Sequence, residues 1–510
     1  MKIGIDVGGT NTDAVLMDGS RVVAGLKSPT TEDVSSGVEE ALRQLQPAIG
    51  ASKIDSLVIG TTQFTNAFVQ GKDLSQVAVL RIGSPATHAL PPLCAWPEHL
   101  LAAIGDCRTI VRGGHNVDGR RIAALDERAV AAFAREIRKR GIKAASVTSV
   151  FAPATPDDEH RAAEIILNEA PDTFLTMSHT TGRLGLLERE NAATMNASLA
   201  ALSKKVVRSF EEAIASAGLN CPFYISQNDG TVLDSKTVAA FPVLTFASGP
   251  TNSMRGAALL SGARDAIIAD IGGTTSDIGA ISNGYPREST VSSDIGGVKT
   301  NFRMPDVFAL GLGGGSLVRT SPDLAIGPIS TGHALHKEAL VFGGSTLTAS
   351  DIVVAAGLAD FGDRSRVAYL DTKFISEALQ LMNVMFEAAV EKMRTSNAEI
   401  PIILVGGGVS LISSKKFGPS EIIIPENSGV ANAVGAALAQ IGGEFDQIIL
   451  YADEPREQAV NRAKAEATAI AIGRGAVESS IEIVDVEEVP LNYVDGDAVR
   501  LRVKAVGDFA

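Results

Sequence analysis

The sequence predicts an α/β protein with two lobes, each built around its own β-sheet. Three observations support this prediction. Apolar runs typical of buried strands alternate with amphipathic segments typical of helices along most of the 510 residues. A strand–glycine–strand motif opens the chain and occurs again in its second half, as expected if each lobe contains the same unit. After residue 443 the pattern changes to strand, charged helix, strand and strand.

The repeated motif is the most informative feature of the chain. The first copy, residues 2–15, reads KIGIDVGGTNTDAV, and the second, residues 266–280, reads AIIADIGGTTSDIGA. Glycine lets the backbone approach a ligand closely, so that N–H groups and Thr hydroxyls can cradle phosphate oxygens. An Asp at the end of a strand is a hard-cation ligand beside that phosphate. One copy alone is more typical of a hairpin turn, but two matched copies predict a clamp for a nucleotide triphosphate.

Composition and charge narrow the class of protein. The hydrophobic content of 45% and the length predict two or three globular domains, and the net charge of −14 argues against nucleic acid or an anionic membrane as a partner. The three cysteines form no Cys-x-x-Cys pair, which argues against zinc ribbons, iron–sulfur clusters and a disulfide framework. The chain enters a predicted strand at once and has no membrane-length apolar run. We therefore expect a soluble cytoplasmic protein.

The first lobe is predicted over residues 1–187. After the first hairpin we expect a helix over 31–45, strands over 54–60, 77–82 and 144–151, and helices over 126–140 and 156–170. Asp126 is a suitable N-cap for the helix that Gly141 closes. Residues 84–120 are aperiodic and rich in Pro and Gly, which predicts an inserted loop region at an active site or domain boundary.

The second lobe is predicted over residues 188–442 and a small β-α-β-β segment over 443–510. In the second lobe we expect helices over 188–217, 246–262, 372–396 and 430–441, and strands over 223–227 and 402–405. In the last segment we expect a helix over 455–472 and strands over 481–489 and 498–506. We predict that this segment is separable from the nucleotide site.

A strand that delivers three glycines forms the third candidate element. The strand over 402–405 ends in Gly406, Gly407 and Gly408, which leave a flat backbone surface suited to an adenosine. Other nucleotide and catalytic motifs are absent: the sequence has no P-loop, no Gly-x-Ser-x-Gly elbow and no His-Glu-x-x-His pair. The glycine run over 311–316 lacks the strand–loop–helix context of a dinucleotide loop.

In this order the three elements resemble the actin-like ATPase superfamily, in which two ribonuclease-H-like lobes hold ATP and a divalent ion. The resemblance implies that Asp6 and Asp270 hold Mg²⁺ or its waters and act in catalysis together with Thr10. It also implies that nucleotide contacts come from Gly8, Gly9, Thr10, Asn11 and Thr12, from Gly272, Gly273, Thr274 and Thr275, and from Gly406, Gly407 and Gly408.

At finer detail the chain resembles the A-type subunits of hydantoinases and 5-oxoprolinases. The resemblance rests on residues 6–13, 60–67, 188–191, 196–197, 248–250, 270–277, 311–316 and 347–351, and covers most of residues 1–440. Two departures affect the expected substrate. Asn11 replaces the family's common aromatic residue, and residues 330–333 (STGH) replace its usual Pro-Gly-Pro stretch.

This resemblance implies an enzyme that opens a cyclic amide, such as a hydantoin or 5-oxoproline, by ATP-dependent phosphorylation of the ring carbonyl followed by hydrolysis. It also implies a second protein subunit, and we expect an oligomer. Such chemistry needs in-line positioning and charge neutralisation more than a covalent nucleophile. The expected substrate contacts are Thr61, Thr62, Thr65, Asn66, Gly313, Gly314 and Ser316. A polar helix start without a ligand is the alternative for residues 61–66.

Other functions stay open because their ATP motifs would be identical. The chain could be a nucleotide-driven regulator or reactivating chaperone, in which ATP drives lobe closure. It could also be a small-molecule kinase or an ATP-using carboxylase subunit. Stimulation of ATP turnover by lactams, as opposed to a protein partner, distinguishes the enzyme from the chaperone.

Overall fold

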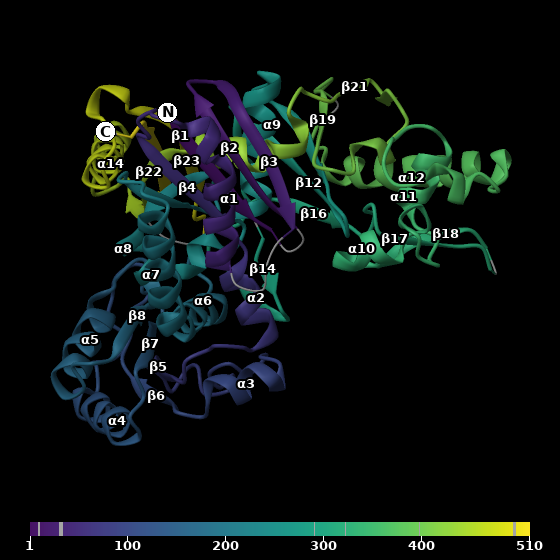
Figure 1. Cartoon of the computed structure of the whole chain (residues 1–510). Helices are drawn as coiled ribbons and strands as arrows, with labels where there is room; N and C mark the ends of the chain where they lie inside the picture. The colour runs from purple at the N-terminus through teal and green to yellow at the C-terminus, as the bar shows by residue number, and fades with distance from the viewer. Residues whose placement is uncertain are drawn as a thin grey trace.

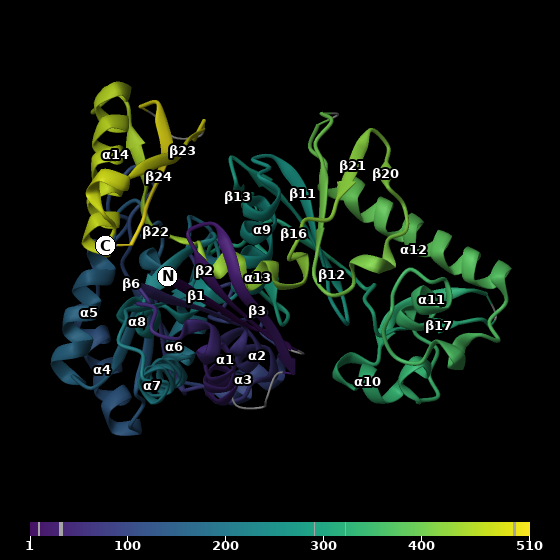
Figure 2. The ribbon, with the colours of Figure 1, turned by 45° about the horizontal axis from the view of Figure 1, so that its top comes forward.

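Two large β-sheets, one in each lobe, lie on either side of a central pair of helices (Figures 1 and 2). The computed structural model describes residues 1–8, 11–29, 34–289, 291–321, 323–396, 398–492 and 496–509. Strands and helices alternate through most of the described chain, as the sequence patterns predicted. None of the described helices is long and apolar enough to cross a membrane.

The first lobe contains a nine-stranded sheet in the order β23-β24-β22-β10-β9-β4-β1-β2-β3. Its strands are β1 (Lys2–Val7), β2 (Asn11–Asp18), β3 (Arg21–Pro29), β4 (Ser56–Thr61), β9 (Phe223–Ser226), β10 (Thr231–Asp234), β22 (Gln440–Leu450), β23 (Glu482–Pro490) and β24 (Ala498–Gly507). Helices α1 (Val34–Ile49) and α7 (Ala200–Ser216) cover one face, and α13 (Ala431–Ala437) and α14 (Arg456–Gly473) cover the other.

The sheet pairing does not follow the division expected from the sequence at residues 187 and 442. Strand β22 pairs in parallel with β10 through Gln440 and Ile441, and β24 pairs along the whole of β22. Residues 223–234 and 440–507 thus complete the sheet that begins at residue 2, and the last segment is not a separate module. The helix expected over 430–441 also ends earlier, at Ala437, because Gln440 already belongs to this sheet.

A smaller parallel sheet, in the order β6-β5-β7-β8, occupies the lower part of Figure 1. Its strands are β5 (Val77–Ser84), β6 (Arg108–Arg112), β7 (Ala144–Ser149) and β8 (Phe174–Met177), and its helices are α3 (Glu98–Ile104), α4 (Glu127–Arg140) and α5 (Asp157–Glu169). The loop region expected over 84–120 therefore contains a helix and a strand. Asp126 caps α4 as predicted, because its side chain accepts the N–H of Ala129.

The single helix expected over 188–217 is two helices, α6 (Leu186–Ser198) and α7, separated at Leu199. The carbonyl of Ser198 accepts the N–H of Ser75 at 2.7 Å. This hydrogen bond from outside the helix is made at the interruption between α6 and α7.

The second lobe contains a seven-stranded sheet in the order β13-β12-β11-β19-β21-β20, with β16 paired to β12. Its strands are β11 (Ala266–Ile271), β12 (Ser276–Ser282), β13 (Tyr285–Pro286), β16 (Val307–Leu310), β19 (Ile402–Val405), β20 (Lys416–Phe417) and β21 (Ser420–Ile423). Helix α9 (Ser248–Ser261) packs on one face and α12 (Thr372–Met393) on the other.

Further short elements extend both lobes. Strands β17 (Ser316–Arg319) and β18 (Ala325–Ser330) and helices α10 (Leu335–Glu338) and α11 (Ala349–Ala355) lie at the far end of the second lobe (Figure 2). The hairpin of β14 (Ser293–Ile295) and β15 (Val298–Thr300) reaches the first lobe, where helices α2 (Gln63–Gln70) and α8 (Ser235–Ala240) lie. There the carbonyl of Lys299 accepts the side-chain amide of Asn191 at 2.8 Å.

The central helices α9 and α13 are in backbone contact. A Cβ on Gly256 of α9 would lie 1.7 Å from the carbonyl oxygen of Ala431, and one on Gly435 of α13 would lie 1.9 Å from that of Asn252. Only glycine permits this approach. Because α9 leads from the first sheet to β11 and α13 leads back to β22, both connections between the sheets pass through this contact.

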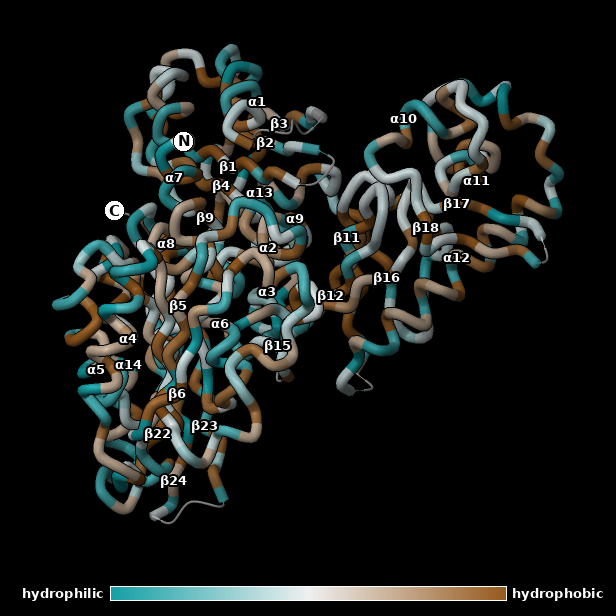
Figure 3. The backbone as a smooth tube through the Cα atoms, turned by 90° about the horizontal axis from the view of Figure 1, so that it is seen from below, coloured by the Kyte–Doolittle hydropathy of each residue, from teal (hydrophilic) through white to brown (hydrophobic). Residues whose placement is uncertain are grey.

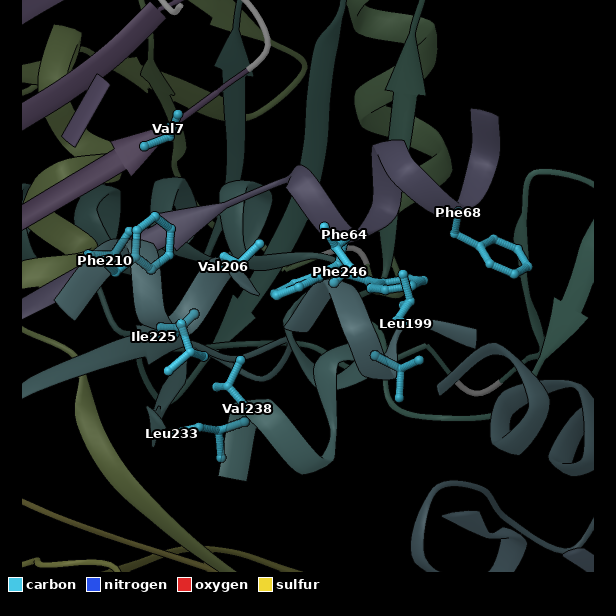
Figure 4. Close-up of a cluster of buried hydrophobic side chains, with 14 of the residues drawn as sticks. Val7, Phe64, Phe68, Leu199, Val206, Phe210, Ile225, Leu233, Val238 and Phe246 are labelled. Atoms are coloured by element: carbon cyan, nitrogen blue, oxygen red, sulfur yellow. The ribbon is translucent and has the colours of Figure 1, made fainter. Parts of the chain in front are cut away.

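Hydrophobic residues concentrate along the strands, as the brown stretches of the backbone tube at β5, β11 and β12 show in Figure 3. The largest core lies in the first lobe, and Figure 4 shows part of it, where residues of β1, α2, α7, α8, β9 and β10 meet. Phe64 and Phe68 of α2 are buried there, one helical turn apart. This core holds the start of α2 beside the end of β4.

Candidate active site between the two glycine hairpins

The two copies of the repeated motif form two hairpins with the same strand register. In the first, Asp6 of β1 pairs with Asp13 of β2, and in the second, Asp270 of β11 pairs with Asp277 of β12. Each hairpin thus places two carboxylates side by side across neighbouring strands. Only the first Asp of each copy was predicted as a site residue, although the second also recurs in the sequence.

The turns of the two hairpins also match. The N–H of Gly8 donates to the carbonyl of Asn11 at 3.0 Å, and the N–H of Gly272 donates to that of Thr275 at 2.9 Å. A Cβ on Gly8 or Gly272 would lie 3.2 Å from the same acceptor oxygen, so the turn leaves little room for a side chain. The duplication seen in the sequence is therefore a duplication of backbone geometry.

Both hairpins line one cleft of about 460 Å³. Eleven of the predicted site residues line this cleft: Asp6, Gly8, Asn11, Thr62, Asp270, Gly272, Gly273, Gly314, Gly406, Gly407 and Gly408. The three glycines after β19 are brought to the second hairpin because β19 pairs in parallel with β11. The cleft therefore unites the three elements that are far apart in the sequence.

Some of the predicted nucleotide contacts are not among the residues that line the cleft. Thr12 is fully buried inside the first lobe, and neither it nor the exposed Thr274 and Thr275 belong to the cleft lining. Gly9 and Thr10 fall outside the described residues.

The polar cluster at residues 61–66 was interpreted either as substrate contacts or as a polar helix start, and the structure has features of both. Thr62 is the N-cap residue of α2 and lines the cleft. Thr61 accepts the N–H of Gln63, and Thr65 donates its hydroxyl to the carbonyl of Phe246 at 2.9 Å. Asn66 donates its amide to the hydroxyl of Thr62 at 3.3 Å. Of these four side chains, only that of Thr62 faces the cleft directly.

The glycine run at 311–316 packs against the turn of the second hairpin and forms hydrogen bonds with its backbone. Gly314 and Gly315 donate their N–H groups to the carbonyls of Gly272 and Gly273, at 3.0 and 2.7 Å. A Cβ on Gly313 would lie 2.6 Å from the backbone of Thr274, and the buried Ser316 accepts the N–H of Gly313. Within this run only Gly314 lines the cleft, and its backbone hydrogen bonds hold the turn of the second hairpin in place.

Asp6 is held by two carboxamides from the central helices. Asn252 of α9 donates to its Oδ1 at 2.8 Å, and Asn432 of α13 donates to its Oδ2 at 3.0 Å. Burial raises the pKa of Asp6 to about 6, against the effect of these two hydrogen bonds. The charges of Asp13 and Asp270 also raise this pKa.

Asp270 and Asp277 lie in a more apolar setting. Burial raises the pKa of Asp270 although its Oδ2 accepts the hydroxyl of Ser253 at 2.5 Å. Burial also raises the pKa of Asp277 to about 7, and the charge of Asp270 acts in the same direction. The cleft thus holds more negative charge than its protein cations neutralise.

Lys27 of β3 is the one cationic side chain among the described residues that line the cleft. Its Nζ lies 2.7 Å from Oδ1 of Asp13, and Asp13 also accepts the side-chain amide of Asn432 at 2.7 Å. Sequence analysis missed Lys27 and both asparagines. No motif marks Lys27, because its place opposite Asp13 depends on the pairing of β2 with β3.

One end of the cleft is apolar. Leu335, Phe342, Val353 and Phe361, from α10, α11 and the connections around them, line it together with Leu411. The rings of Phe342 and Phe361 stack with centroids 5.9 Å apart and 17° between their planes. Phe342 is 39% exposed, so its ring is accessible from the cleft.

The donor set fits a magnesium ion that binds together with a phosphate. Mg²⁺ keeps several waters and takes one or two carboxylates plus phosphate oxygens instead of a cage of protein ligands. Asp6 and Asp270 both line the cleft and could supply these one or two carboxylates. Burial is the main cause of the raised pKa of both carboxyls, and a cation there would stabilise their ionised forms.

The chain matches known families and proteins. Residues 2–170 match the hydantoinase/oxoprolinase N-terminal region, and residues 189–399 match the hydantoinase/oxoprolinase family. The caprolactamase alpha subunit of Pseudomonas jessenii is 26% identical over 385 residues, which cover 70% of this chain and 55% of that subunit. The acetophenone carboxylase gamma subunit of Aromatoleum aromaticum is 27% identical over 394 residues, which cover 70% of this chain and 53% of that subunit. The chain spans about half the length of these two relatives.

Two solved structures have the same fold. The ATP-dependent caprolactamase of Pseudomonas jessenii matches with a TM-score of 0.79 at 19% identity, over 99% of this chain and 87% of that one. Nucleotide-free acetone carboxylase matches with a TM-score of 0.68 at 16% identity, over 99% of this chain and 88% of that one. Both likenesses confirm the predicted fold class, an α/β protein with two lobes.

Proposed function

This chain belongs to the hydantoinase/oxoprolinase family, and on that premise we propose that it binds Mg²⁺·ATP in the cleft and uses it to open a cyclic amide. The observation that carries the proposal is the pair of Asp-x-Gly-Gly hairpins that line a single cleft. Two turns with free space and inward aspartates suit a triphosphate between them.

Charge supports the need for a cation. The cleft contains the four hairpin aspartates and one lysine, Lys27. A triphosphate brings several more negative charges, which would repel those carboxylates at short range. When bound, Mg²⁺ supplies the charge neutralisation that phosphoryl transfer needs. Asp6 and Asp270 would hold it or its waters, and Lys27 would neutralise a phosphate oxygen.

The other end of the cleft suits the base. Gly407 is open and exposed, and no atom would lie within 4 Å of a Cβ there, so a ribose can approach its backbone. Beyond it, the stacked Phe342 and Phe361 offer an aromatic surface on which a purine can stack. The cleft thus has a polar end for phosphates and an apolar end for adenine.

In the proposed reaction, the ring carbonyl oxygen attacks the γ-phosphorus and the bond to the ADP oxygen breaks. Water then adds to the carbonyl carbon, the ring C–N bond breaks as the nitrogen takes up a proton, and an acyl phosphate results. A second water attacks the same carbon, forms the carboxylic acid and releases phosphate with the oxygen it received from the ring. Phosphorylation makes a resonance-stabilised amide electrophilic. Thr62 and Gly314, at the cleft wall beside the two hairpins, would orient the ring. We also propose a second subunit, since both named relatives are described as subunits.

Calorimetry with Mg²⁺·ATP tests the nucleotide site. We expect Asp6→Ala and Asp270→Ala to weaken Mg²⁺-dependent binding about 10-fold or more, because each removes a charged ligand of the proposed cation. Exposed Asp323→Ala is the control. Unchanged affinity in both cleft variants would exclude the phosphate clamp.

A panel of lactams and hydantoins, scored by phosphate release with and without a co-expressed partner, tests the reaction. A ring substrate labelled with ¹⁸O at its carbonyl should transfer the label to phosphate. The likeness to two carboxylases favours one alternative, an ATP-using carboxylase subunit. Stimulation by a ketone with bicarbonate, and by no ring amide, would establish that alternative.

A further inference from the structure

Two consecutive side chains of α9 hydrogen-bond aspartates that belong to different lobes. Asn252 donates to Oδ1 of Asp6 at 2.8 Å, and Ser253 donates to Oδ2 of Asp270 at 2.5 Å. Both donors are buried. One turn of one helix therefore contacts one cleft carboxylate from each of the two hairpins.

The position of this pair along α9 is fixed by backbone contact. Gly435 of α13 lies against the backbone of Asn252, with room for no side chain. One turn further along α9, Gly256 meets Ala431 in the same way. Because backbone packing of this kind cannot slide without a clash, the helix cannot move along its axis to follow one lobe alone. Asn252 and Ser253 are thus held at a constant offset from each other and from α13.

A glycine in the first-lobe sheet provides the space in which Asn252 and Asp6 form their hydrogen bond. Gly60 of β4 is the register partner of Asp6 in the neighbouring parallel strand. A Cβ on Gly60 would lie 2.1 Å from Oδ1 of Asp6 and 2.3 Å from Nδ2 of Asn252. The backbone of Gly60 is not in the left-handed region, so the absence of a side chain there serves this contact and not a turn.

We infer that Asn252 and Ser253 are positioning residues, which orient Asp6 and Asp270 toward one shared cation and so couple the two lobes to nucleotide binding. This inference rests on the proposed function. Carboxylates that hold a metal are oriented by hydrogen bonds from the residues around them, and loss of such a donor lowers metal affinity about 10–100-fold. Here both donors come from one rigid helix, so the orientation of each carboxylate depends on the same element.

The test measures how strongly Mg²⁺ enhances ATP binding, as the ratio of the ATP dissociation constants in EDTA and in Mg²⁺, by calorimetry. We expect Asn252→Ala, Ser253→Ala and Gly60→Ala each to lower this ratio about 10-fold. ATP affinity in EDTA should change less than about 2-fold, because the glycine turns and the apolar end remain. Gly60→Ala acts on the same hydrogen bond as Asn252→Ala but keeps both of its partners.

Ser261→Ala on the same helix is the matched control, since its hydroxyl donates to the carbonyl of Ala257 within α9. The binding stoichiometry reports the folded fraction of each variant, so a loss of folding is separated from a loss of coupling. Variants that bind ATP at full stoichiometry and keep the ratio of the parent protein would overturn the inference while the proposed function stands. Absence of ATP binding by the parent protein would overturn both.

Discussion

Two carboxyl groups in the cleft, those of Asp277 and Asp6, destabilise the folded protein when they are ionised. Asp277 has a pKa of about 7 because of its burial and the charge of Asp270, and Asp6 has a pKa of about 6, chiefly because of its burial. Folding thus disfavours the ionised form of these side chains. Carboxyl groups with a strongly raised pKa are typical of ligand sites, where a bound positive charge stabilises their ionised form.

The raised pKa of Asp277 predicts how the stability of the nucleotide-free protein depends on pH. Its folded pKa lies above its unfolded value, so ionisation destabilises the fold progressively as pH rises from about 4 to about 7. Asp277→Asn should therefore stabilise the protein at pH 8 by about 1–3 kcal/mol, since one pKa unit corresponds to about 1.4 kcal/mol. The gain should be smaller at pH 5. Urea unfolding at both pH values measures it, with exposed Asp323→Asn as the control. An equal gain at both pH values would contradict the assignment.

The aromatic end of the cleft predicts a base-specific loss of affinity. Phe342→Ala should weaken binding of ATP and ADP to a similar extent, by about 1–3 kcal/mol, because base–aromatic stacking has that magnitude. Binding of inorganic triphosphate should not change, since the glycine turns are intact. Tyr369, which is 71% exposed and does not line the cleft, supplies the control Tyr369→Ala. Equal losses for triphosphate and ATP would place the base elsewhere.

Among the structural elements, α9 and α13 have the strictest packing requirement. They connect the two sheets, contact each other through their backbones, and bring Asn252 and Asn432 to the same carboxylate. Their small residues, such as Ala433 and Ala437 of α13, also let β1 approach at Gly4. The glycine and alanine content of these segments therefore serves close contact between elements, not flexibility.

This packing predicts a sharp difference between two glycines. Gly256→Ala should destabilise the protein by about 1–3 kcal/mol or more through overpacking, although alanine favours a helix over glycine. Gly429→Ala, just before α13, should change stability by less than about 0.5 kcal/mol, because nothing lies within 4 Å of its Cβ. Thermal and urea unfolding measure both. A neutral Gly256→Ala would show that the helices can separate without loss.

At the scale of the whole molecule, a segment of the second lobe is embedded in the first. Residues 287–306, apart from residue 290, carry the β14–β15 hairpin against the first lobe, and the side chain of Phe302 enters its core. At the base of this segment, Glu288 and Arg303 join an ion-pair network with the strands β22 and β24. The network also includes Glu444, Asp446, Arg183, Arg500 and Arg502.

Arg303 tests the contribution of this network. Its side chain is 14% exposed, and it contacts Glu288, Glu444 and Asp446, so its removal leaves half-buried carboxylates with less positive charge. Arg303→Met should cost about 3 kcal/mol in the free energy of unfolding. The exposed Arg161 also contacts two carboxylates, and Arg161→Met should cost less than about 1 kcal/mol. Similar effects of the two substitutions would mean that the network contributes no more than a surface ion pair.

Local pattern was enough to predict most of the elements and the centre of the site. The Asp-x-Gly-Gly turns could be recognised because the two carboxylates and the turn between them lie within eight residues. Their duplication could be seen without knowledge of the fold. The predicted helix over 126–140 and the strand over 402–405 agree with α4 and β19 because periodicity and capping are local properties.

The tertiary structure alone decided which distant segments complete these local units. Asn432 reaches Asp6 across 426 positions of sequence, and Lys27 and Phe342 enter the cleft through the pairing of β3 and the placing of α10 and α11. The same holds for residues 440–507, whose strand pattern was visible but whose place in the first-lobe sheet was not. Periodicity records which side of an element is buried, whereas the partner on that side depends on packing that the local sequence does not encode.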